Sequence, residues 1–378
     1  MADPFVKKTY YAITLDPVHI GTGGYRLGRV DNTITREPGT NIPKIPGSSI
    51  SGATRAYTAM AIQSANQTEI NKDYEIDYKK YLKWKYQRPR YKMSIKGNGN
   101  AIIEVDADKK PLYEGDNPNE PKYYSCAGKG ADDGEGHCGA PDCEVCVPFG
   151  FSKGKSGSSF QGLAQFYDAR ILFFPVHSMI GPVWVTCPSV LSEFGVTSSV
   201  KDRKFSAING ERNQKLNFGW IMLEHDASTK IDFSAFPDNK KFCDVCNVIM
   251  NRAYLVSDKL FSRIVNDNLE VRTSVAIDPA TGAAEEGALY TYEAIPRATV
   301  MWFDVVYNRP EYFRVRQNGI DQIIQHGKNT EGEGWKWIQE NVEKGLLLME
   351  HMGVGAMNTR GMGRFRILNI GGTVHGNT

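Results

Sequence analysis

Five potential metal ligands lie within one short segment and give the chain its clearest chemical signal. They are Cys126, His137, Cys138, Cys143 and Cys146. Cysteine thiolates at this spacing can bind one tetrahedral Zn²⁺ ion, and the last two residues form a CxxC motif. Four ligands complete such a site, and we predict that His137 is the spare one. A site with four protein ligands has no open position, so we expect a structural zinc that staples a segment with little apolar core of its own.

A second CxxC motif, Cys243 and Cys246, lacks nearby partners. It is a metal half-site, a redox pair or simply two buried thiols, and buried thiols are the commonest outcome. Seven cysteines in a chain that shows no secretory signal argue against a disulfide scaffold. Cys187 is most simply a core residue.

A glycine-rich loop near the N-terminus begins at His19 and ends at Asp31. From residue type alone, an aspartate in such a loop more often stabilises a turn than takes part in catalysis. Together the two side chains could act as general acid and base, or Asp31 could hold a divalent cation near a scissile phosphate. Their spacing does not decide between these roles.

Residues Gly47, Ser48 and Ser49 open a segment with helical spacing, predicted as a helix from about Ser49 to Ser64. Backbone amides at the N-terminus of a helix form an anion site. A phosphate chain bound there would pass close to Asp31. We therefore hypothesise that this stretch binds RNA and cuts it.

A second glycine-rich loop, residues 353–363, precedes the last predicted strand. Its backbone amides could cradle phosphates, with Asn358 and Arg360 as side-chain contacts. The alternative is a tight turn before an edge strand. The sequence leaves both interpretations open.

Residues 65–160 are polar, rich in tyrosine and short of regular periodicity, which is typical of an insertion. Within them, residues 78–92 hold seven positive residues, five aromatic residues and no acids. Basic residues interleaved with aromatic ones suit single-stranded nucleic acid, through phosphate pairing and base stacking. The alternative is a solvated helix or loop that docks on a neighbouring subunit.

Periodicity and turn signals predict the remaining elements. They are strands at 8–15, 162–176, 182–186, 298–307 and 364–368, a hairpin at 271–295 that turns at 278–282, and a helix at 335–352. Without insertions, the order is strand, helix, two strands, helix, strand. This is the order of the ferredoxin-like (RRM-type) fold. In that fold the first and last strands can be close, so the two glycine loops could share one face.

We therefore predict an α+β protein with a ferredoxin-like core, a zinc-stapled insertion and a protruding β-hairpin. The core would comprise residues 1–64 and 161–378, with the hairpin over about 271–297. The insertion would comprise residues 65–160 and would include the zinc-binding segment 126–146.

The composition describes a soluble globular protein, with 41% hydrophobic and 23% charged residues among 378. The formal net charge is only +2, so any RNA must be held by local positive charge or by amides and hydroxyls. No apolar run reaches the ~18 residues needed to cross a bilayer, and the start of the chain is not typical of a signal peptide. We expect a cytoplasmic protein that does not contact membranes.

Several motifs, taken in order, resemble the RAMP superfamily, and within it the backbone subunits of type III CRISPR RNA-guided effector complexes. The motifs are PKIPGSSISGATR (Pro43–Arg55), CEVCVPFG (Cys143–Gly150), DARILFFPVHS (Asp168–Ser178) with VWVTCP (Val183–Pro188), and GAMNTRGMG (Gly355–Gly363). The third motif is most similar to the Cmr, or type III-B, branch. The CxxC followed by Phe-Gly resembles the Csm branch, as in types III-A and III-D. Residues 65–125 have no counterpart in this resemblance.

The resemblance implies that copies of the chain stack along a CRISPR RNA. The partners would be CRISPR RNA, single-stranded target RNA and other effector subunits: a large signalling subunit, small subunits and a RAMP subunit that caps the 5′ end of the guide. The predicted hairpin matches the family's thumb, which kinks the guide–target duplex at regular intervals. Its apolar residues, such as Ile277 and Leu289, would wedge between bases.

The resemblance also implies a reaction. Asp31 matches the family's catalytic residue for cutting target RNA, and His19 matches a residue implicated in cleavage in the Cmr branch. The expected chemistry is attack of the 2′-hydroxyl on the adjacent phosphate, dependent on Mg²⁺ or another divalent cation, with Asp31 positioning the metal or the hydroxyl. Base pairing would read the sequence, while the protein reads shape and backbone.

The sequence departs from the family at Ser51, where a lysine is usual after the Gly-Ser-Ser-aliphatic run. Arg55, Lys44 or the insertion would then replace this guide-phosphate charge, beside Ser48 and Ser49. Two alternatives stay open at this point. One is a structural backbone subunit that has Asp31 but does not cut, and the other is a stand-alone zinc-containing protein that binds or processes RNA.

Overall fold

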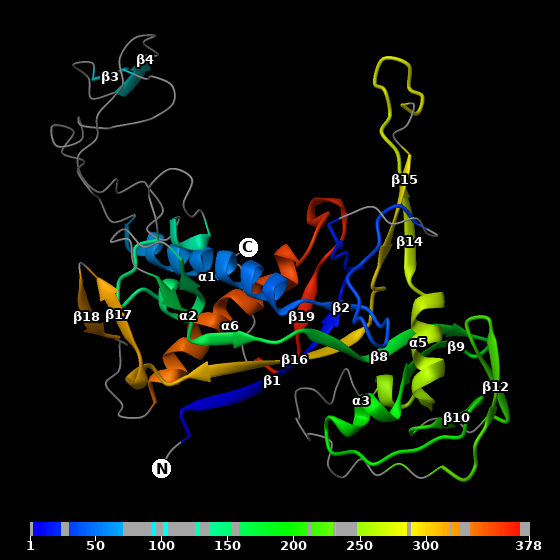
Figure 1. Ribbon diagram of the computed structural model, residues 1–378. Coiled ribbons are helices and arrows are strands. Elements are labelled where there is room, and N and C mark those ends of the chain that lie inside the picture. The colour runs from blue at the N-terminus through cyan, green and yellow to red at the C-terminus, as the bar shows by residue number, and fades with distance from the viewer. Residues whose placement is uncertain are drawn as a thin grey trace.

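The computed structural model describes residues 3–23, 30–70, 92–95, 101–104, 125–128, 137–152, 159–209, 213–229, 231, 248–285, 289–317, 319–324 and 333–370 (Figure 1). This part of the chain has a mixed α/β fold built on one large sheet. The strands of the sheet are β1 (Phe5–Thr14), β2 (Lys44–Ile45), β7 (Ala164–Phe166), β8 (Ala169–Ser178), β9 (Gly181–Thr186), β10 (Lys204–Ala207), β11 (Lys215–Phe218), β12 (Ile221–His225), β13 (Ala253–Val256), β16 (Val300–Asn308) and β19 (Phe365–Ile367).

Within the described residues, the 11-stranded sheet has the order β11-β12-β10-β13-β9-β8-β16-β1-β19, with β2 beside β8 and β7 beside β16. Four further strand pairs lie outside it: β3 (Lys92–Ile95) with β4 (Ala101–Glu104), β5 (Gly150–Phe151) with β6 (Phe160–Gln161), β14 (Glu270–Ser274) with β15 (Tyr290–Ala294), and β17 (Arg314–Gln317) with β18 (Ile320–Ile323). The helices are α1 (Gly47–Ile70), α2 (Cys146–Phe149), α3 (Pro188–Ser192), α5 (Asp258–Asp267) and α6 (Gly334–Met352), with short 3₁₀ helices η1 (Ser125–Ala127), η2 (Pro310–Tyr312) and η3 (Asn358–Arg360).

The central strand β1 is buried on both faces because its side chains alternate between two cores. Tyr10 belongs to the main core, and Tyr11 to a second core on the other face. In the second core, the rings of Phe194 and Trp302 pack edge to face with centroids 5.0 Å apart. The strand predicted at 8–15 is therefore present as β1, antiparallel to both β16 and β19.

Helices α1 and α6 lie together over β1 and β16 (Figure 1). The apolar stripe of α6, which includes Ile338, Val342 and Leu346, is fully buried, as its helical spacing predicts. The helix predicted at 335–352 is confirmed. Helix α1 is longer than predicted at both ends. It continues past Ser64 because no proline or glycine interrupts the chain between Ser64 and Ile70.

The β-strands between residues 204 and 256 extend the sheet beyond what the sequence indicates. Strand β13 runs parallel to β9, and β10 runs parallel to β12. Strand β11 then returns toward β8, where Gly219 N donates to His177 O (2.9 Å) and Met179 N donates to Asn217 Oδ1 (2.7 Å). These strands are four or five residues long, too short for a clear alternating pattern.

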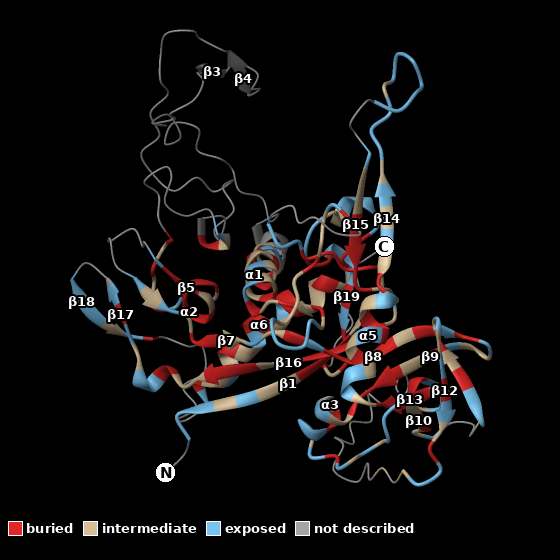
Figure 2. Cartoon of the chain, turned by 45° about the vertical axis from the view of Figure 1, so that its right-hand side comes forward, coloured by how far each residue is buried: buried red, intermediate tan, exposed pale blue. Residues whose placement is uncertain are grey.

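The hairpin of β14 and β15 projects from the body of the protein (Figure 1), and we call it the thumb. Its turn is closed by two backbone hydrogen bonds, from Gly282 N to Asp278 O (2.8 Å) and from Asp278 N to Ala283 O (2.9 Å). Figure 2 shows that the outer part of the thumb is exposed, whereas the end of β15 at its base is buried. The predicted hairpin at 271–295 and its turn are confirmed.

The cysteine-bearing segment packs into the main core, contrary to our expectation that it has little core of its own. Cys126, Cys143, Cys146 and Val147 are all buried in that core. The reason is that η1 packs against α1 and α2 packs against α6, so the segment shares the apolar faces of the two large helices.

Candidate functional site

Strand β15, at the base of the thumb, contacts both glycine-rich loops, the N-terminal one at two residues and the C-terminal one at one residue. Thr291 contacts Asp31 of the N-terminal loop, and Glu293 contacts His19 at the start of the same loop. Tyr290 contacts Arg360 of the C-terminal glycine loop. One strand of five residues therefore brings together three of the residues that the sequence singled out.

Asp31 is fixed by paired hydrogen bonds with Thr291. Its Oδ2 accepts from Thr291 N (2.7 Å) and from Thr291 Oγ1 (2.9 Å), and its own N donates to Thr291 Oγ1 (3.1 Å). The donors on Thr291 hold the pKa of the exposed Asp31 carboxyl below its usual range. The side chain is thus an ionised, oriented carboxylate at neutral pH.

His19 is buried and held from the same strand. Its Nδ1 lies 2.6 Å from Glu293 O, which can only accept, so Nδ1 carries a proton. The ring packs edge to face on Tyr292, and its Nε2 lies toward Gly21. Because Thr291 and Glu293 are two residues apart, the attachment points of Asp31 and His19 on β15 are ~7 Å apart.

An ion pair links the segment after Asp31 to the same part of β15. The Nη2 atom of Arg36 lies 2.7 Å from Oε2 of Glu293, whose side chain is 8% exposed. Arg36 Nε also donates to Asn266 Oδ1 of α5 (3.0 Å). The carboxylate of Glu293 is therefore engaged by Arg36, while its backbone carbonyl orients His19.

The two glycine loops share one face of the fold, as predicted. Ala356 N donates to His19 O (3.0 Å), and Gly363 N donates to Pro17 O (2.9 Å). Gly355 is required by this close approach, because a Cβ there would lie 2.5 Å from His19 O. The two loops consequently form one continuous backbone surface at the base of the thumb.

The side chains predicted as phosphate contacts in the C-terminal loop differ in their surroundings. Arg360 is exposed, and its Nη1 donates to Tyr290 OH (3.1 Å). The Oδ1 of Asn358 is buried and has no hydrogen-bond partner among the described residues. Among the described residues, only Nη1 of Arg360 has a hydrogen-bond partner, so the guanidinium keeps further N–H donors next to β15.

The Gly-Ser-Ser turn at the start of α1 already holds a carboxylate. Asp168 accepts hydrogen bonds from Gly47 N (2.8 Å) and from Lys44 Nζ (2.6 Å). The positive charge of Lys44 is therefore paired, and part of the helix N-terminus is satisfied by an anion from the chain itself. Ser48 is exposed and Ser49 half-buried at the same turn.

Arg55 lies at the cysteine cluster, away from the start of the helix. Its Nε donates to Cys126 O (2.7 Å), and its Nη2 lies 3.1 Å from His137 Nδ1. Ser51, one turn earlier on α1, is half-buried. The RNA contact predicted for Arg55 would require the guanidinium to leave these partners.

The four cysteines predicted as zinc ligands converge. The Sγ atoms of Cys126, Cys138, Cys143 and Cys146 all lie within 4.8 Å of one another. Two of the pairs are 3.7 and 3.9 Å apart. Four thiolates around a zinc at ~2.3 Å in tetrahedral geometry would be ~3.8 Å apart. This cluster of four cysteines could hold a metal ion, and His137 is not one of its members.

The thumb residues predicted to wedge between bases are exposed. Ile277 is 56% and Leu289 67% exposed, although apolar side chains of this size are usually buried. Ile277 lies opposite Ala284 across the hairpin. Apolar side chains are thus available on a protruding element.

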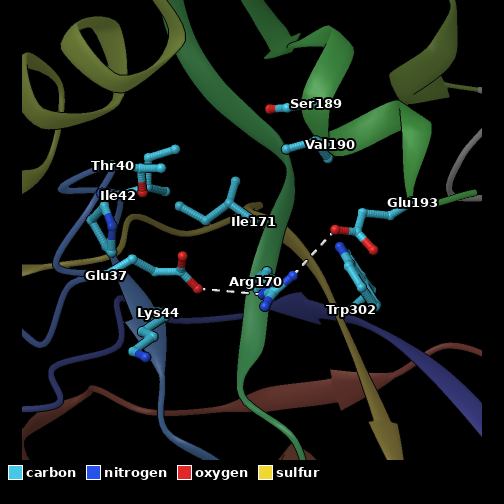
Figure 3. A pocket seen from close by; sticks show the side chains of 11 residues that line it. Glu37, Thr40, Ile42, Lys44, Arg170, Ile171, Ser189, Val190, Glu193 and Trp302 are labelled. Carbon is cyan, nitrogen blue, oxygen red and sulfur yellow. Dashed lines mark hydrogen bonds and ion pairs between the residues drawn. The ribbon is translucent and has the colours of Figure 1, made fainter. Parts of the chain in front are cut away.

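A cavity of about 210 Å³ lies between the loop after Arg36, strand β8 and α3 (Figure 3). At its centre, Arg170 reaches Glu37 (3.3 Å) and Glu193 (3.4 Å), and its guanidinium lies over the ring of Trp302. Because two carboxylates neutralise Arg170, the cavity offers little positive charge to a phosphate.

Some of the predicted features lie outside the described residues. These are Gly24 and Gly28, the basic and aromatic run over residues 78–91, and the second CxxC motif at Cys243 and Cys246. Conversely, sequence reasoning missed Thr291, Tyr290 and Glu293, which lie on β15 and contact the two glycine-rich loops. The only available signal for them was that they lie in the predicted hairpin.

Among the described residues, no helix is long and apolar enough to cross a membrane. The model of one protein family, described as the RAMP superfamily, matches residues 11–366. The chain belongs to the RAMP superfamily. The resemblance seen in the sequence motifs is confirmed, and the match spans the N-terminal loop, the cysteine cluster, the thumb and the C-terminal loop.

Two kinds of relative give this membership more detail. The chain is 23% identical over 306 residues to the CRISPR system Cmr endoribonuclease Cmr4 of Pyrococcus furiosus, with 76% of this RAMP chain and 77% of that protein covered. Its fold is similar to a chain of the type III-B Cmr-beta structure in the apo state, with a TM-score of 0.50 and 13% identity over 96% of this chain and 97% of that one. A chain of the type III-B Cmr-beta structure bound to cognate target RNA gives 0.47 at 13% identity, over 97% and 99%.

Proposed function

We propose that this RAMP protein is a repeated backbone subunit of a type III CRISPR ribonucleoprotein, which binds CRISPR RNA and cuts complementary target RNA at regular intervals. The observation that carries the proposal is the convergence of Asp31, His19 and Arg360 on strand β15, at the base of a thumb with exposed apolar residues. The likeness to a protein named a Cmr endoribonuclease supports the same reaction class.

In the proposed reaction, the 2′-oxygen of one nucleotide attacks the adjacent phosphorus. The bond from phosphorus to the 5′-oxygen of the next nucleotide breaks, which leaves a 2′,3′-cyclic phosphate and a 5′-hydroxyl. The 2′-hydroxyl gives up its proton and the leaving 5′-oxygen gains one. The ionised Asp31 carboxylate orients the attacking hydroxyl, and His19, whose Nδ1 donates to Glu293 O, has Nε2 for proton transfer.

The site offers one carboxylate that could bind a divalent cation. Mg²⁺ commonly binds through one or two carboxylates together with phosphate oxygens and water. Asp31 is the residue that would hold it, since the carboxylate of Glu293 is paired with Arg36. When bound, such a cation would supply charge stabilisation at the phosphate.

We propose two groups of RNA contacts around this centre. Near the start of α1 they are Ser48, Ser49 and Ser51, with Lys44 and Arg55 less available because of their partners Asp168 and Cys126. In the C-terminal loop they are Asn358 and Arg360.

The thumb supplies a third kind of RNA contact in this proposal. Ile277 and Leu289 would insert between base pairs and kink the guide–target duplex, as apolar wedges do in other nucleic-acid complexes. Their exposure on a protruding hairpin supports this role.

We propose a structural zinc at the four-cysteine cluster. The mutual distances of the sulfur atoms fit tetrahedral coordination by four thiolates. Because the segment also packs on α1 and α6, the ion would lock the insertion onto the helical face of the core. A site with four thiolates leaves no position for a reacting water, so we assign it no part in cleavage.

The arrangement of the central strands supports the ferredoxin-like core. In chain order β1, α1, β8, β16, α6 and β19, the strands lie side by side as β8-β16-β1-β19, all antiparallel. We propose that this core comprises residues 1–64 and 161–378 and that residues 65–160 are an insertion into it.

The proposed partners follow from this function. They are CRISPR RNA, single-stranded target RNA, further copies of the chain in a helical stack, the large signalling subunit, the small subunits and the RAMP subunit at the guide 5′ end. We propose that the complex acts in the cytoplasm.

The purified full-length chain and the complex assembled with guide RNA test this function together. We expect co-purifying RNA, self-assembly, and products of a labelled complementary RNA that differ by a constant length. Chelation of divalent cations should stop cleavage and spare binding. A monomer without RNA would instead favour a stand-alone zinc-containing protein, and a complex that binds target without cutting would favour an inactive structural subunit.

A further inference from the structure

Arg364 binds Asp16 at the root of the thumb, and two further arginines from separate segments, Arg297 and Arg272, lie near enough for their charges to act on the same carboxylate. Leu15 N donates to Arg364 O (2.9 Å), and Ala298 N donates to Thr14 O (2.8 Å), so residues 297 and 364 lie on either side of the end of β1. The side chain of Arg364 donates to both oxygens of Asp16, at 3.1 Å from Nη2 to Oδ1.

The charges of all three arginines act on the same carboxylate. The hydrogen bond from Arg364 lowers the pKa of Asp16 below its usual range, and the nearby charges of Arg297 and Arg272 add to this effect. Arg272 lies on β14, so the cluster joins the thumb to the ends of β1 and β19.

The cluster has more positive charge than the carboxylates near it can neutralise. Arg364 pairs with Asp16, and Arg272 pairs with Glu270 (2.6 Å). Arg297 is exposed and has no ion-pair or hydrogen-bond partner within the part of the chain that the structure describes. A guanidinium has five N–H donors, so the two paired arginines also keep donors for a further acceptor.

We propose that Arg272, Arg297 and Arg364 form a phosphate-binding site for the backbone of an RNA strand, with Arg297 as its direct contact. The proposal rests on the RNA binding proposed above and adds a site separate from the Asp31 carboxylate. The planar guanidinium of arginine can donate two parallel hydrogen bonds to two oxygens of one phosphate. The open position of the cluster, with the Arg364 side chain 49% exposed, fits a strand that crosses the surface.

The salt dependence of RNA binding tests this site. We would titrate a short labelled single-stranded RNA into the full-length chain at several salt concentrations and compare the chain with Arg297→Gln. Each lost phosphate contact on a single strand lowers the slope of log K against log salt by about 0.7. We expect that decrease in Arg297→Gln, with weaker binding at low salt. The matched control is Arg263→Gln, an exposed arginine on α5 whose loss should leave the slope unchanged.

A second variant should change binding in the opposite direction. Asp16→Asn removes the carboxylate that occupies Arg364, so we expect tighter RNA binding and a slope steeper by about 0.7. A variant that merely unfolds cannot bind more tightly, so this result would separate the electrostatic effect from a loss of structure.

The outcomes distinguish this site from the proposed function. If the unchanged chain binds RNA and neither variant alters the slope, the arginine site is wrong and RNA binding stands. If the unchanged chain binds no RNA, both are wrong. If inorganic phosphate alone binds the chain by calorimetry and Arg297→Gln abolishes that binding without altering the RNA slope, the cluster holds a free phosphate ion and the proposed RNA contact is overturned.

Discussion

At the scale of single residues, the candidate site depends on how Asp31 is held. Its carboxylate is exposed, yet two hydrogen bonds from Thr291 fix its direction and keep it ionised, and a third hydrogen bond, from the backbone N of Asp31, anchors the loop to the same hydroxyl. Thr291, at the root of the thumb, therefore sets the orientation of the Asp31 carboxylate. Any movement of the thumb would be transmitted to Asp31 through Thr291.

We predict that Thr291→Val lowers the cleavage rate of the assembled complex by about 10- to 100-fold, because misplacement of a reacting group by ~1 Å can have an effect of that size. Valine keeps the shape and the backbone N–H but removes the hydroxyl that both donates to and accepts from Asp31. Thr291→Ser keeps the hydroxyl and should retain most of the rate. Single-turnover kinetics at saturating target would measure both variants. Equal rates for valine and serine would contradict the positioning role.

Residue types and motifs predicted a set of candidate side chains but not the neighbours that hold them. The cysteine spacing indicated the four cysteines that cluster in the structure, and the family resemblance indicated Asp31 and His19. Nothing local indicated that Arg55 would reach Cys126 or that Asp168 would occupy Lys44 and the start of α1. Those contacts join residues about 70 to 120 positions apart, and no short sequence pattern encodes them.

At the scale of elements, the packing of α1 on α6 supports both the cysteine cluster and the start of α1. The two helices touch at Gly345, where a Cβ would lie 2.3 Å from Thr54 O. Periodicity predicted both helices because their apolar stripes are long. It missed the short strands between residues 204 and 256, whose pairing depends on partners elsewhere in the sheet.

We predict opposite effects on stability for alanine at two helical glycines. Gly345→Ala should lower the free energy of unfolding by about 1–3 kcal/mol, because the added methyl group forces the helices apart. Gly52→Ala on α1 meets no atom within 4 Å and should raise it by about 0.5–1 kcal/mol through better helix propensity. Chemical denaturation of both variants measures the difference. A destabilised Gly52→Ala together with an unchanged Gly345→Ala would refute the packing described for α1 and α6.

The cysteine cluster leads to a prediction about metal content. Replacing Cys143 and Cys146 together by serine should lower bound zinc from about one ion per chain to near zero, because two of four ligands are lost. The variant should also unfold at a lower temperature, since the cluster joins η1 and α2 to the main core. Cys187→Ala, also at a buried cysteine, is the control and should keep its zinc. Metal analysis that finds full zinc in the double variant would disprove the ligand set.

At the scale of the whole molecule, one surface at the base of the thumb combines the two glycine loops, the Asp31 carboxylate and the root of a protruding hairpin. The low net charge of the chain agrees with a surface that presents backbone amides and a few local arginines. A strand of RNA on this surface would lie beside both Asp31 and the apolar residues of the thumb. Binding and cutting would then depend on different residues, and a variant could lose one without the other.

The central claim is that Asp31 cuts the target RNA, and Asp31→Asn in the assembled complex tests it most directly. Asparagine keeps the size of the side chain and removes its charge. With a labelled complementary RNA, we predict cleavage lower by about 10²–10⁴-fold, with guide and target binding unchanged. Asp321→Asn, at another exposed carboxylate with a lowered pKa, should cleave normally. Cleavage at the unchanged rate and the same regular intervals in Asp31→Asn would contradict the account.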